Sequence, residues 1–207
     1  MVPDTSEEEA CLRLGYLTVA GVDEVGRGPL AGPVVAAAVV LPSCRGAWWK
    51  EVRDSKALTP LARARLAPRI EAEAAVGVGL ASAQEIDTRG LTQATRLAMQ
   101  RALCSLLAPP DFLLVDGLPT AWLGAPQRAI VGGDATCLSI AAASVVAKLF
   151  RDRLMEEQDR CYPAYGFARH RGYATPDHLA ALRSQGPCPI HRVSYRPVAE
   201  AAGLLLL

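Results

Sequence analysis

The sequence lacks several features that mark specialised classes of protein. Its 207 residues include only three histidines and no Cys-x-x-Cys pair, and its six cysteines are widely spaced. We therefore expect reduced, mostly buried thiols and neither a zinc site nor a disulfide framework. No uninterrupted apolar run reaches the ~20 residues needed to span a bilayer, and the N-terminus has no basic and apolar signal segment. We expect a cytoplasmic protein with no membrane association.

A strong net charge is also absent. The formal net charge is +1, which by itself does not indicate a nucleic-acid-binding protein. The charges are unevenly distributed, because the first 24 residues are mainly acidic and the chain after residue 148 has an excess of Lys and Arg. This pattern is compatible with a cleft between an acidic centre and a basic C-terminal part, or with ordinary solvated helix faces. The length suits one large domain, or one domain with a small appendage.

Two adjacent acidic residues end the first predicted strand. Residues 17–25 begin as an apolar run typical of a buried strand, and Asp23 and Glu24 lie near its end. Buried acids are uncommon unless they are paired or bind a metal, so they indicate a cation, a proton to be transferred, or a salt bridge to Arg27. On a regular strand the two side chains point to opposite faces. Glu24 therefore needs a local distortion or acts through its backbone carbonyl.

The acidic pair runs directly into a Gly-Arg-Gly turn formed by Gly26, Arg27 and Gly28. Glycines on both sides of a cation let another backbone approach closely, and a guanidinium matches the geometry of phosphate. The turn is not a dinucleotide-binding fingerprint, because a second apolar run, residues 34–41, follows where a helix would begin. These features favour contact with a nucleic-acid backbone.

Further acids lie at the ends of later predicted strands. Residues 112–115 predict a short buried strand that ends in Asp116, and Asp134 precedes a long helix predicted from about residue 136 to 160. Taken singly, Asp116 suits an Asx turn with Gly117, and Asp134 suits a helix N-cap. Three acidic strand ends in one α/β chain can instead converge on a single site. A Ser followed by three Glu at residues 6–9 also predicts a short N-terminal helix with Ser6 as its N-cap.

Together these motifs resemble those of bacterial type 2 ribonuclease H, or ribonuclease HII. The resemblance runs from about residue 17 to 197 and rests on residues 20–42, Asp54-Ser55-Lys56, Val115-Asp116-Gly117, Gly133-Asp134-Ala135, residues 140–144, Tyr165-Gly166-Phe167 and His170-Arg171-Gly172-Tyr173. It implies an α/β ribonuclease H-like fold, with a mixed five-stranded sheet flanked by helices. Residues 1–16 are then a tail or short helix, 17–160 the catalytic core, and 161–207 a helical C-terminal part completing the substrate cleft.

The resemblance implies a monomeric endonuclease that hydrolyses the RNA strand of RNA/DNA hybrids. It also implies a nick on the 5′ side of ribonucleotides in duplex DNA, leaving 3′-hydroxyl and 5′-phosphate ends, as in ribonucleotide excision repair and RNA primer removal. Such hydrolysis is served by two Mg²⁺ or Mn²⁺ ions held by carboxylates. The expected catalytic and metal-binding residues are Asp23, Glu24, Asp116 and Asp134. Asp23 is expected to bridge both ions, with Asp116 and Asp134 each completing one.

The same resemblance implies a set of substrate contacts. The Gly-Arg-Gly turn and Tyr173 are expected around the 2′-OH of the ribonucleotide, and Lys56, Ser144 and Lys148 at substrate phosphates. Ser144 and Lys148 share one face of the predicted helix, which Arg151 is able to join. The family usually has Lys where Arg171 stands.

The family also often has Lys where this chain has Gly132. Because both departures leave the acids unchanged, they bear on affinity more than on activity.

Two other kinds of protein remain as alternatives. One is a different nuclease of similar fold, such as a type 3 ribonuclease H or a junction resolvase, and the Gly-Arg-Gly turn with Tyr173 favours the type 2 enzyme over these. The other is a module that binds RNA/DNA hybrids without catalysis. Four acids facing a phosphate backbone would weaken such binding, so their presence speaks against it.

Overall fold

The computed structural model describes residues 2–43, 46–53, 55, 57–117 and 123–204. Its centre is a five-stranded sheet in the order β3-β2-β1-β4-β5. The strands are β1 (Val19–Val25), β2 (Val34–Val40), β3 (Ala75–Ala81), β4 (Phe112–Asp116) and β5 (Gln127–Ile130). β1 and β3 run antiparallel to β2, whereas β4 runs parallel to β1 and to β5. The sheet is therefore mixed, as predicted.

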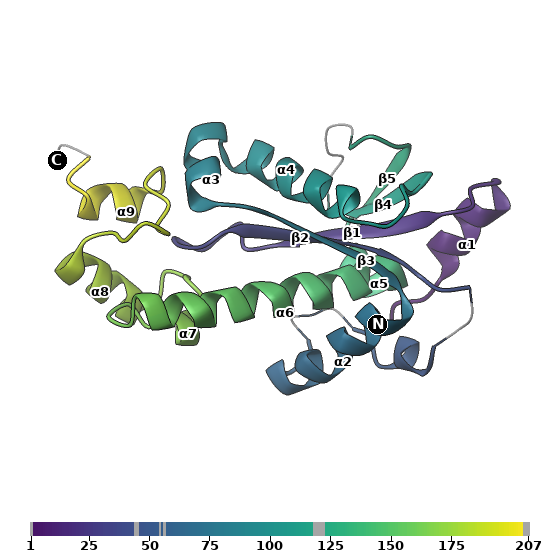
Figure 1. The fold of residues 1–207 in the computed structure, drawn as a ribbon, viewed down its shortest axis with the longest axis horizontal. Coiled ribbons are helices and arrows are strands. Elements are labelled where there is room, and N and C mark those ends of the chain that lie inside the picture. Colours follow the sequence, from purple (N-terminus) through teal and green to yellow (C-terminus); the bar gives the residue numbers. More distant parts are fainter. Residues whose placement is uncertain (1, 44–45, 54, 56, 118–122, 205–207) are drawn as a thin grey trace.

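Helices cover both faces of the sheet (Figure 1). On one face, α4 (Leu91–Cys104) packs across β1, β2 and β3 with α3 (Ala83–Arg89) beside it. On the other, α6 (Leu138–Cys161) crosses β1, β2 and β4 and carries α2 (Pro60–Glu73) on its outer side. β1 and β2 are almost entirely apolar because both of their faces are covered.

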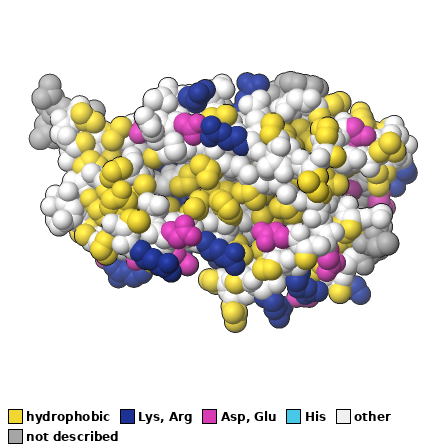
Figure 2. Space-filling model, viewed as in Figure 1, with side chains coloured by type: hydrophobic (Ala, Val, Ile, Leu, Met, Phe, Trp, Pro, Cys, Tyr) yellow, Lys and Arg dark blue, Asp and Glu magenta, His cyan; other side chains and the backbone are white. Residues whose placement is uncertain are grey.

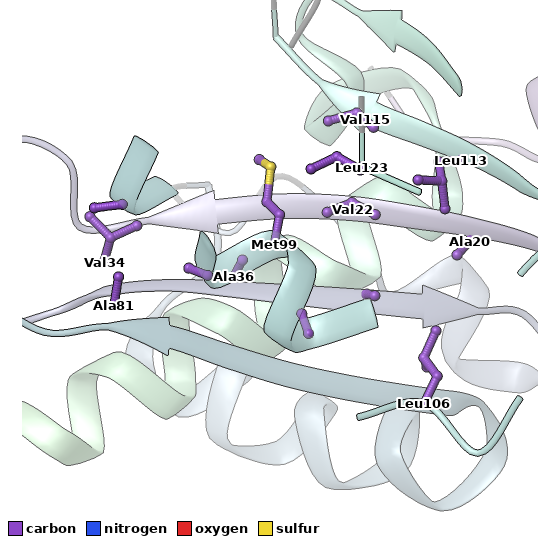
Figure 3. Close-up of a cluster of buried hydrophobic side chains, with 14 of the residues drawn as sticks. Ala20, Val22, Val34, Ala36, Ala81, Met99, Leu106, Leu113, Val115 and Leu123 are labelled. Atoms are coloured by element: carbon purple, nitrogen blue, oxygen red, sulfur yellow. The ribbon is translucent and has the colours of Figure 1, made fainter. Parts of the chain in front are cut away.

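Small residues let the helices approach the sheet closely. A Cβ added to Gly21 in β1 would lie 2.3 Å from the backbone of Ser139 in α6. A Cβ on Gly79 in β3 would likewise lie 2.3 Å from the carbonyl oxygen of Ala98 in α4. Between the sheet and α4 the core is filled by larger side chains, including Val22, Met99 and Val115 (Figure 3). The central strand, which carries the acidic pair, is thus fixed from both sides.

The C-terminal part lies at the end of the sheet where β1 passes into β2 (Figure 1). It contains α7 (Phe167–His170), α8 (Pro176–Gln185) and α9 (Arg196–Ala201). The turn between β1 and β2 is joined to it by a β-bridge between Ala31 and His191 and by the Gly32 N–H, which donates to the Ile190 carbonyl at 2.8 Å. The C-terminal part therefore forms a wall beside the Gly-Arg-Gly turn.

The remaining elements lie around this frame. They are α1 (Ser6–Arg13), a 3-10 helix (Ala47–Lys50) and the single-turn helix α5 (Gly133–Thr136).

Figure 2 shows hydrophobic side chains gathered along the middle of one face, with charged side chains of both signs along its lower border. Within the described part of the chain, no helix is both long and apolar enough to cross a membrane.

Two local predictions were wrong, and the alternative of Asp134 as a helix N-cap is not seen. Ser6 is the first residue of α1 and Thr5 is its N-cap, because the Asp4 carboxylate accepts the Ser6 N–H at 2.9 Å. The long helix begins at Leu138, because Cys137 is extended and bridges to Asp4. Asp134 consequently lies inside α5 and is not the N-cap of the long helix.

Candidate active site

Asp23 and Glu24 lie just beyond the point where β1 stops pairing with β4. The parallel ladder ends at Val22 and Val115, whereas pairing with β2 continues residue for residue through Val25. β1 therefore has no bulge against β2 at the acidic pair, and the distortion considered for Glu24 is not seen there. The Glu24 N–H donates to Asp23 Oδ1 at 2.7 Å, so the first carboxylate turns back over the strand end.

The acidic pair is electrostatically strained by its surroundings. Burial raises the pKa of Asp23 well above its ordinary value, and the nearby charges of Glu24 and Asp116 raise it further. Burial also raises the pKa of Glu24, although Arg27 opposes this through an ion pair with 3.2 Å between Arg27 Nη1 and Glu24 Oε1. Among the residues that the structure describes, Arg27 is the one cation hydrogen-bonded to the acidic pair. Negative charge is therefore concentrated at this site. Such a group of carboxylates is suited to binding a cation.

Asp116 and Asp134 are linked through the start of α5. The Gly133 N–H donates to Asp116 Oδ1 at 2.7 Å, and Asp134 is the next residue. Asp134 is buried, and Asp116 ends β4 beside Asp23 on β1. The strand ends therefore bring Asp23, Glu24 and Asp116 together, and α5 adds Asp134 next to Asp116. This is the convergence expected from repeated acids at strand ends.

Ser144 lies beneath the carboxylates and is not on an open surface. It is buried in α6, where it interacts with the Asp23 carboxyl group and partly offsets the rise in the pKa of that group. The hydroxyls of Ser144 and Ser55 are also hydrogen-bonded, with 2.8 Å between the two Oγ atoms. Ser144 therefore connects the acidic pair to the segment before α2. Lys56, predicted in that segment as a phosphate contact, lies outside the described residues.

Lys148 is held by an acid one helical turn further along α6. Its Nζ donates to Asp152 Oδ1 at 2.6 Å, and Asp152 also lies 3.6 Å from Arg63 and 3.7 Å from Arg171. Burial lowers the pKa of Lys148, and the carboxylate of Asp152 opposes that shift. Asp152 thus forms ion pairs with basic side chains from α2, α6 and the C-terminal part. Spacing along one helix cannot reveal this role, because Arg63 and Arg171 come from distant segments of the chain.

The glycines of the Gly-Arg-Gly turn have different roles. Gly26 has a φ of +94°, and a Cβ there would lie 2.2 Å from Arg151 Nε, so the fold itself requires glycine. A Cβ on Gly28 would meet only the Tyr173 ring, at 3.7 Å. Tyr173 is 43% exposed. Gly28 therefore faces the exposed Tyr173 ring with no other described neighbour at this distance, and we call the space beside these two residues the passage.

Arg151 does not join Ser144 and Lys148, which corrects the prediction from helical spacing. Its guanidinium is fully buried and donates to three backbone carbonyls, those of Ala31, Pro33 and Arg171. Burial lowers the pKa of Arg151 to about 10. Its side chain binds the turn after β1 to the loop before Tyr173. A single helix spacing cannot reveal this, because the carbonyls come from distant segments.

The donor set is consistent with a Mg²⁺ or Mn²⁺ ion. In the region that the structure describes, no three acidic, imidazole or thiol groups are drawn closely enough to enclose a metal by themselves. Mg²⁺ usually keeps several waters and takes one or two carboxylates together with substrate phosphate oxygens, and Mn²⁺ accepts the same ligands. The concentrated negative charge at Asp23, Glu24 and Asp116 therefore matches an ion whose coordination is completed by water and substrate.

Carboxylates at neighbouring strand ends of a mixed α/β sheet, beside a Gly-Arg-Gly turn and an accessible tyrosine, define a nuclease-type site. The family model described as Ribonuclease HII matches residues 20–198, and the chain belongs to that family. A ribonuclease HII of Geobacter sulfurreducens is 51% identical over 197 residues, covering 95% of this chain and 90% of the relative.

Solved structures agree with this assignment. The ribonuclease H2 from Pyrococcus horikoshii superposes with a TM-score of 0.76 at 27% identity, covering 91% of this chain and 98% of that one. A Bst ribonuclease HIII in complex with Mn²⁺ has a TM-score of 0.70 at 22% identity, covering 94% of this chain and 72% of that one, and shows the shared fold. The chain is therefore a metal-dependent endonuclease of the ribonuclease H type, whose family acts on RNA/DNA hybrids.

Proposed function

We propose that this enzyme both hydrolyses the RNA strand of RNA/DNA hybrids and nicks duplex DNA on the 5′ side of an embedded ribonucleotide. The observation that carries the second activity is the approach of Gly28, in the turn just after β1 and the acidic pair, to the exposed ring of Tyr173. A ribose placed in this passage would lie against the backbone of the turn and an aromatic ring together. Its 2′-OH is the one local group that distinguishes RNA from DNA.

The acids supply the chemistry of hydrolysis. Asp23, Glu24, Asp116 and Asp134 would hold two Mg²⁺ or Mn²⁺ ions. When bound, such ions neutralise charge on the attacking and leaving oxygens of a phosphodiester. The Glu24 N–H orients the Asp23 carboxylate, and Ser144 supports it from α6. This arrangement holds one carboxylate in position before substrate arrives, which lowers the reorganisation needed for reaction.

Cations around the acids would hold the substrate backbone. Lys148 lies one turn from Asp152, and Arg27 reaches over Glu24 with half of its side chain exposed. We assign both to phosphate contacts, together with Lys56, whereas Ser144 acts through Asp23 and Ser55. The C-terminal part from residue 161 closes the other side of the cleft. The enzyme would work as a cytoplasmic monomer in ribonucleotide excision repair and RNA primer removal.

The proposed activity is tested with a labelled DNA duplex that contains one ribonucleotide. With Mg²⁺ or Mn²⁺ we expect one nick 5′ to that residue, with 3′-hydroxyl and 5′-phosphate ends, and no nick when EDTA is present. Asp23→Asn should bind the duplex without cutting it. Cleavage of an RNA/DNA hybrid without any cleavage of this duplex would limit the function to hybrids, and cutting of an all-DNA control would refute ribonucleotide recognition.

A further inference from the structure

All three histidines of the chain meet in the C-terminal part, away from the carboxylates. The rings of His170 and His178 are stacked with 4.4 Å between centroids, and His178 Nε2 lies 3.0 Å from His191 Nε2. Each of these side chains is buried. None of them takes part in the proposed hydrolysis. Their hydrogen bonds nevertheless lead directly to Tyr173.

The directions of these hydrogen bonds follow from the groups at each end of the series. His178 Nδ1 faces the Tyr173 carbonyl at 2.9 Å, so it must carry the proton and donate. A neutral imidazole has one N–H, so His178 Nε2 accepts and His191 Nε2 donates to it. His191 Nδ1 is then left to accept from the Cys188 N–H, at 2.9 Å. The series from Cys188 to Tyr173 therefore has one consistent set of neutral tautomers.

The residue after His191 holds the opposite wall of the same passage. Arg192 is fully buried, and its guanidinium donates to the carbonyls of Gly26, Arg27 and Gly32. Tyr195 adds a second donor to the Arg27 carbonyl, at 2.7 Å. Arg192 therefore fixes the Gly-Arg-Gly turn by its backbone, whereas the Arg27 side chain points to Glu24.

We propose that His178 and Arg192 are positioning residues that together set the distance between Tyr173 and the Gly-Arg-Gly turn. His178 anchors the Tyr173 carbonyl, and His191 holds His178 in the tautomer that donates. Arg192, the neighbour of His191, anchors the turn. The segment 188–192 thus ties both walls of the ribose passage to one short piece of chain. This inference rests on the proposed recognition of an embedded ribonucleotide.

Loss of this anchoring should affect two substrates unequally. A uniform RNA/DNA hybrid offers a ribose at every position, so a shifted Tyr173 still finds a 2′-OH in a neighbouring register. A duplex with one ribonucleotide has a single productive register. The ratio of kcat/KM for the single-ribonucleotide duplex to that for the hybrid therefore reports the geometry of the passage. It does not depend on the fraction of enzyme that is correctly folded.

The test compares three substitutions at one buried position. His178→Leu removes the side-chain donor to the Tyr173 carbonyl and leaves the Thr175 N–H, which donates at 2.8 Å, as the one described donor. His178→Gln has an amide that is one methylene too far from the backbone to replace Nδ1. His178→Asn places an amide N–H near the position of Nδ1 and restores the donor. Tyr165→Phe is a matched control, because it loses a 2.7 Å hydrogen bond to the Gly186 carbonyl in the same part but keeps the ring that packs against His191.

We expect Leu and Gln at position 178 to lower the kcat/KM ratio about tenfold, the effect of about one hydrogen bond, and Asn to restore it to within about threefold. Tyr165→Phe should leave the ratio unchanged even if the Tm falls. An unchanged ratio in the Leu or Gln variant, or an Asn variant no better than Gln, would overturn the inference alone. A wild-type enzyme that cuts only the hybrid would refute it together with the proposed function, and the two failures are thus distinguishable.

Discussion

At the scale of single residues, the site concentrates charge at a cost in stability. Asp23 is buried beside Glu24 and Asp116, and all three groups are acidic. Burying like charges is unfavourable without a bound cation. The fold tolerates this arrangement because β1 is fixed between α4 and α6.

Asp23→Asn is therefore expected to stabilise the metal-free protein while abolishing cleavage. Removing one buried negative charge should raise stability by about 1–2 kcal/mol, which corresponds to roughly 2–8 °C in Tm for a chain of this size. Thermal unfolding in EDTA measures the change. Asp177→Asn, which alters an exposed pair with Arg169, serves as the control and should leave Tm unchanged. A lower Tm for Asp23→Asn would contradict the account.

Gly28 offers a second prediction at the residue scale. A Cβ there meets only the Tyr173 ring, at an ordinary contact distance of 3.7 Å, so Gly28→Ala should fold with a Tm within about 1 °C of the wild type. The same methyl group narrows the ribose passage, and we expect kcat/KM on a single-ribonucleotide duplex to fall about tenfold or more. Gly26→Ala is the comparison, because it should destabilise the fold. Full activity of Gly28→Ala would show that substrate does not use the passage.

At the scale of elements, the C-terminal part depends on neutral histidines. Burial, with a contribution from neighbouring His178, lowers the pKa of His191 to about 4 from an ordinary value of 6.5. As the pH falls below 6.5, the unfolded chain takes up a proton that the folded chain refuses until about pH 4. The contribution of neutral His191 to the free energy of unfolding is complete above pH 6.5 and declines as the pH falls from 6.5 to about 4.

The expected loss is about 2 kcal/mol at pH 5 and about 3 kcal/mol by pH 4. Urea unfolding at pH 7 and pH 5 measures it. His191→Gln keeps a donor toward His178 but has no proton to gain, so its stability should change less over the same interval. His170 and His178 remain in that variant, and the difference between the two proteins isolates His191. An equal loss in both would disprove the assignment.

The elements also show what sequence reasoning can and cannot supply. Apolar runs predicted β1 and β4, whereas the mixed five-stranded sheet was implied by the resemblance to ribonuclease HII. Repeated acids at strand ends predicted that the carboxylates converge. The roles of Arg151 and Arg192 could not be found this way, because each binds carbonyls of segments distant in the sequence. Helical spacing correctly placed Arg151 on α6 but could not show that its side chain is buried.

At the scale of the whole molecule, the helices on both faces of the sheet and the C-terminal part meet near the end of the central strand β1. The sheet supplies the acids, α6 supports them through Ser144, and the C-terminal part holds the ribose passage through Arg192 and His178. Under the proposed function, chemistry and substrate recognition come from different parts of the chain that share the turn after β1. The recognition of one 2′-OH is the central claim that follows from this arrangement.

The most direct measurement compares duplexes that differ only in one 2′ substituent. Three otherwise identical DNA duplexes carry a hydroxyl, a hydrogen or a methoxy group at a single sugar, and cleavage next to that sugar is followed with Mg²⁺. The account predicts cleavage of the hydroxyl duplex alone, with the other two at least about a thousandfold slower. Comparable cutting of the hydrogen or methoxy duplex would contradict it, because the passage would then not read the 2′-OH.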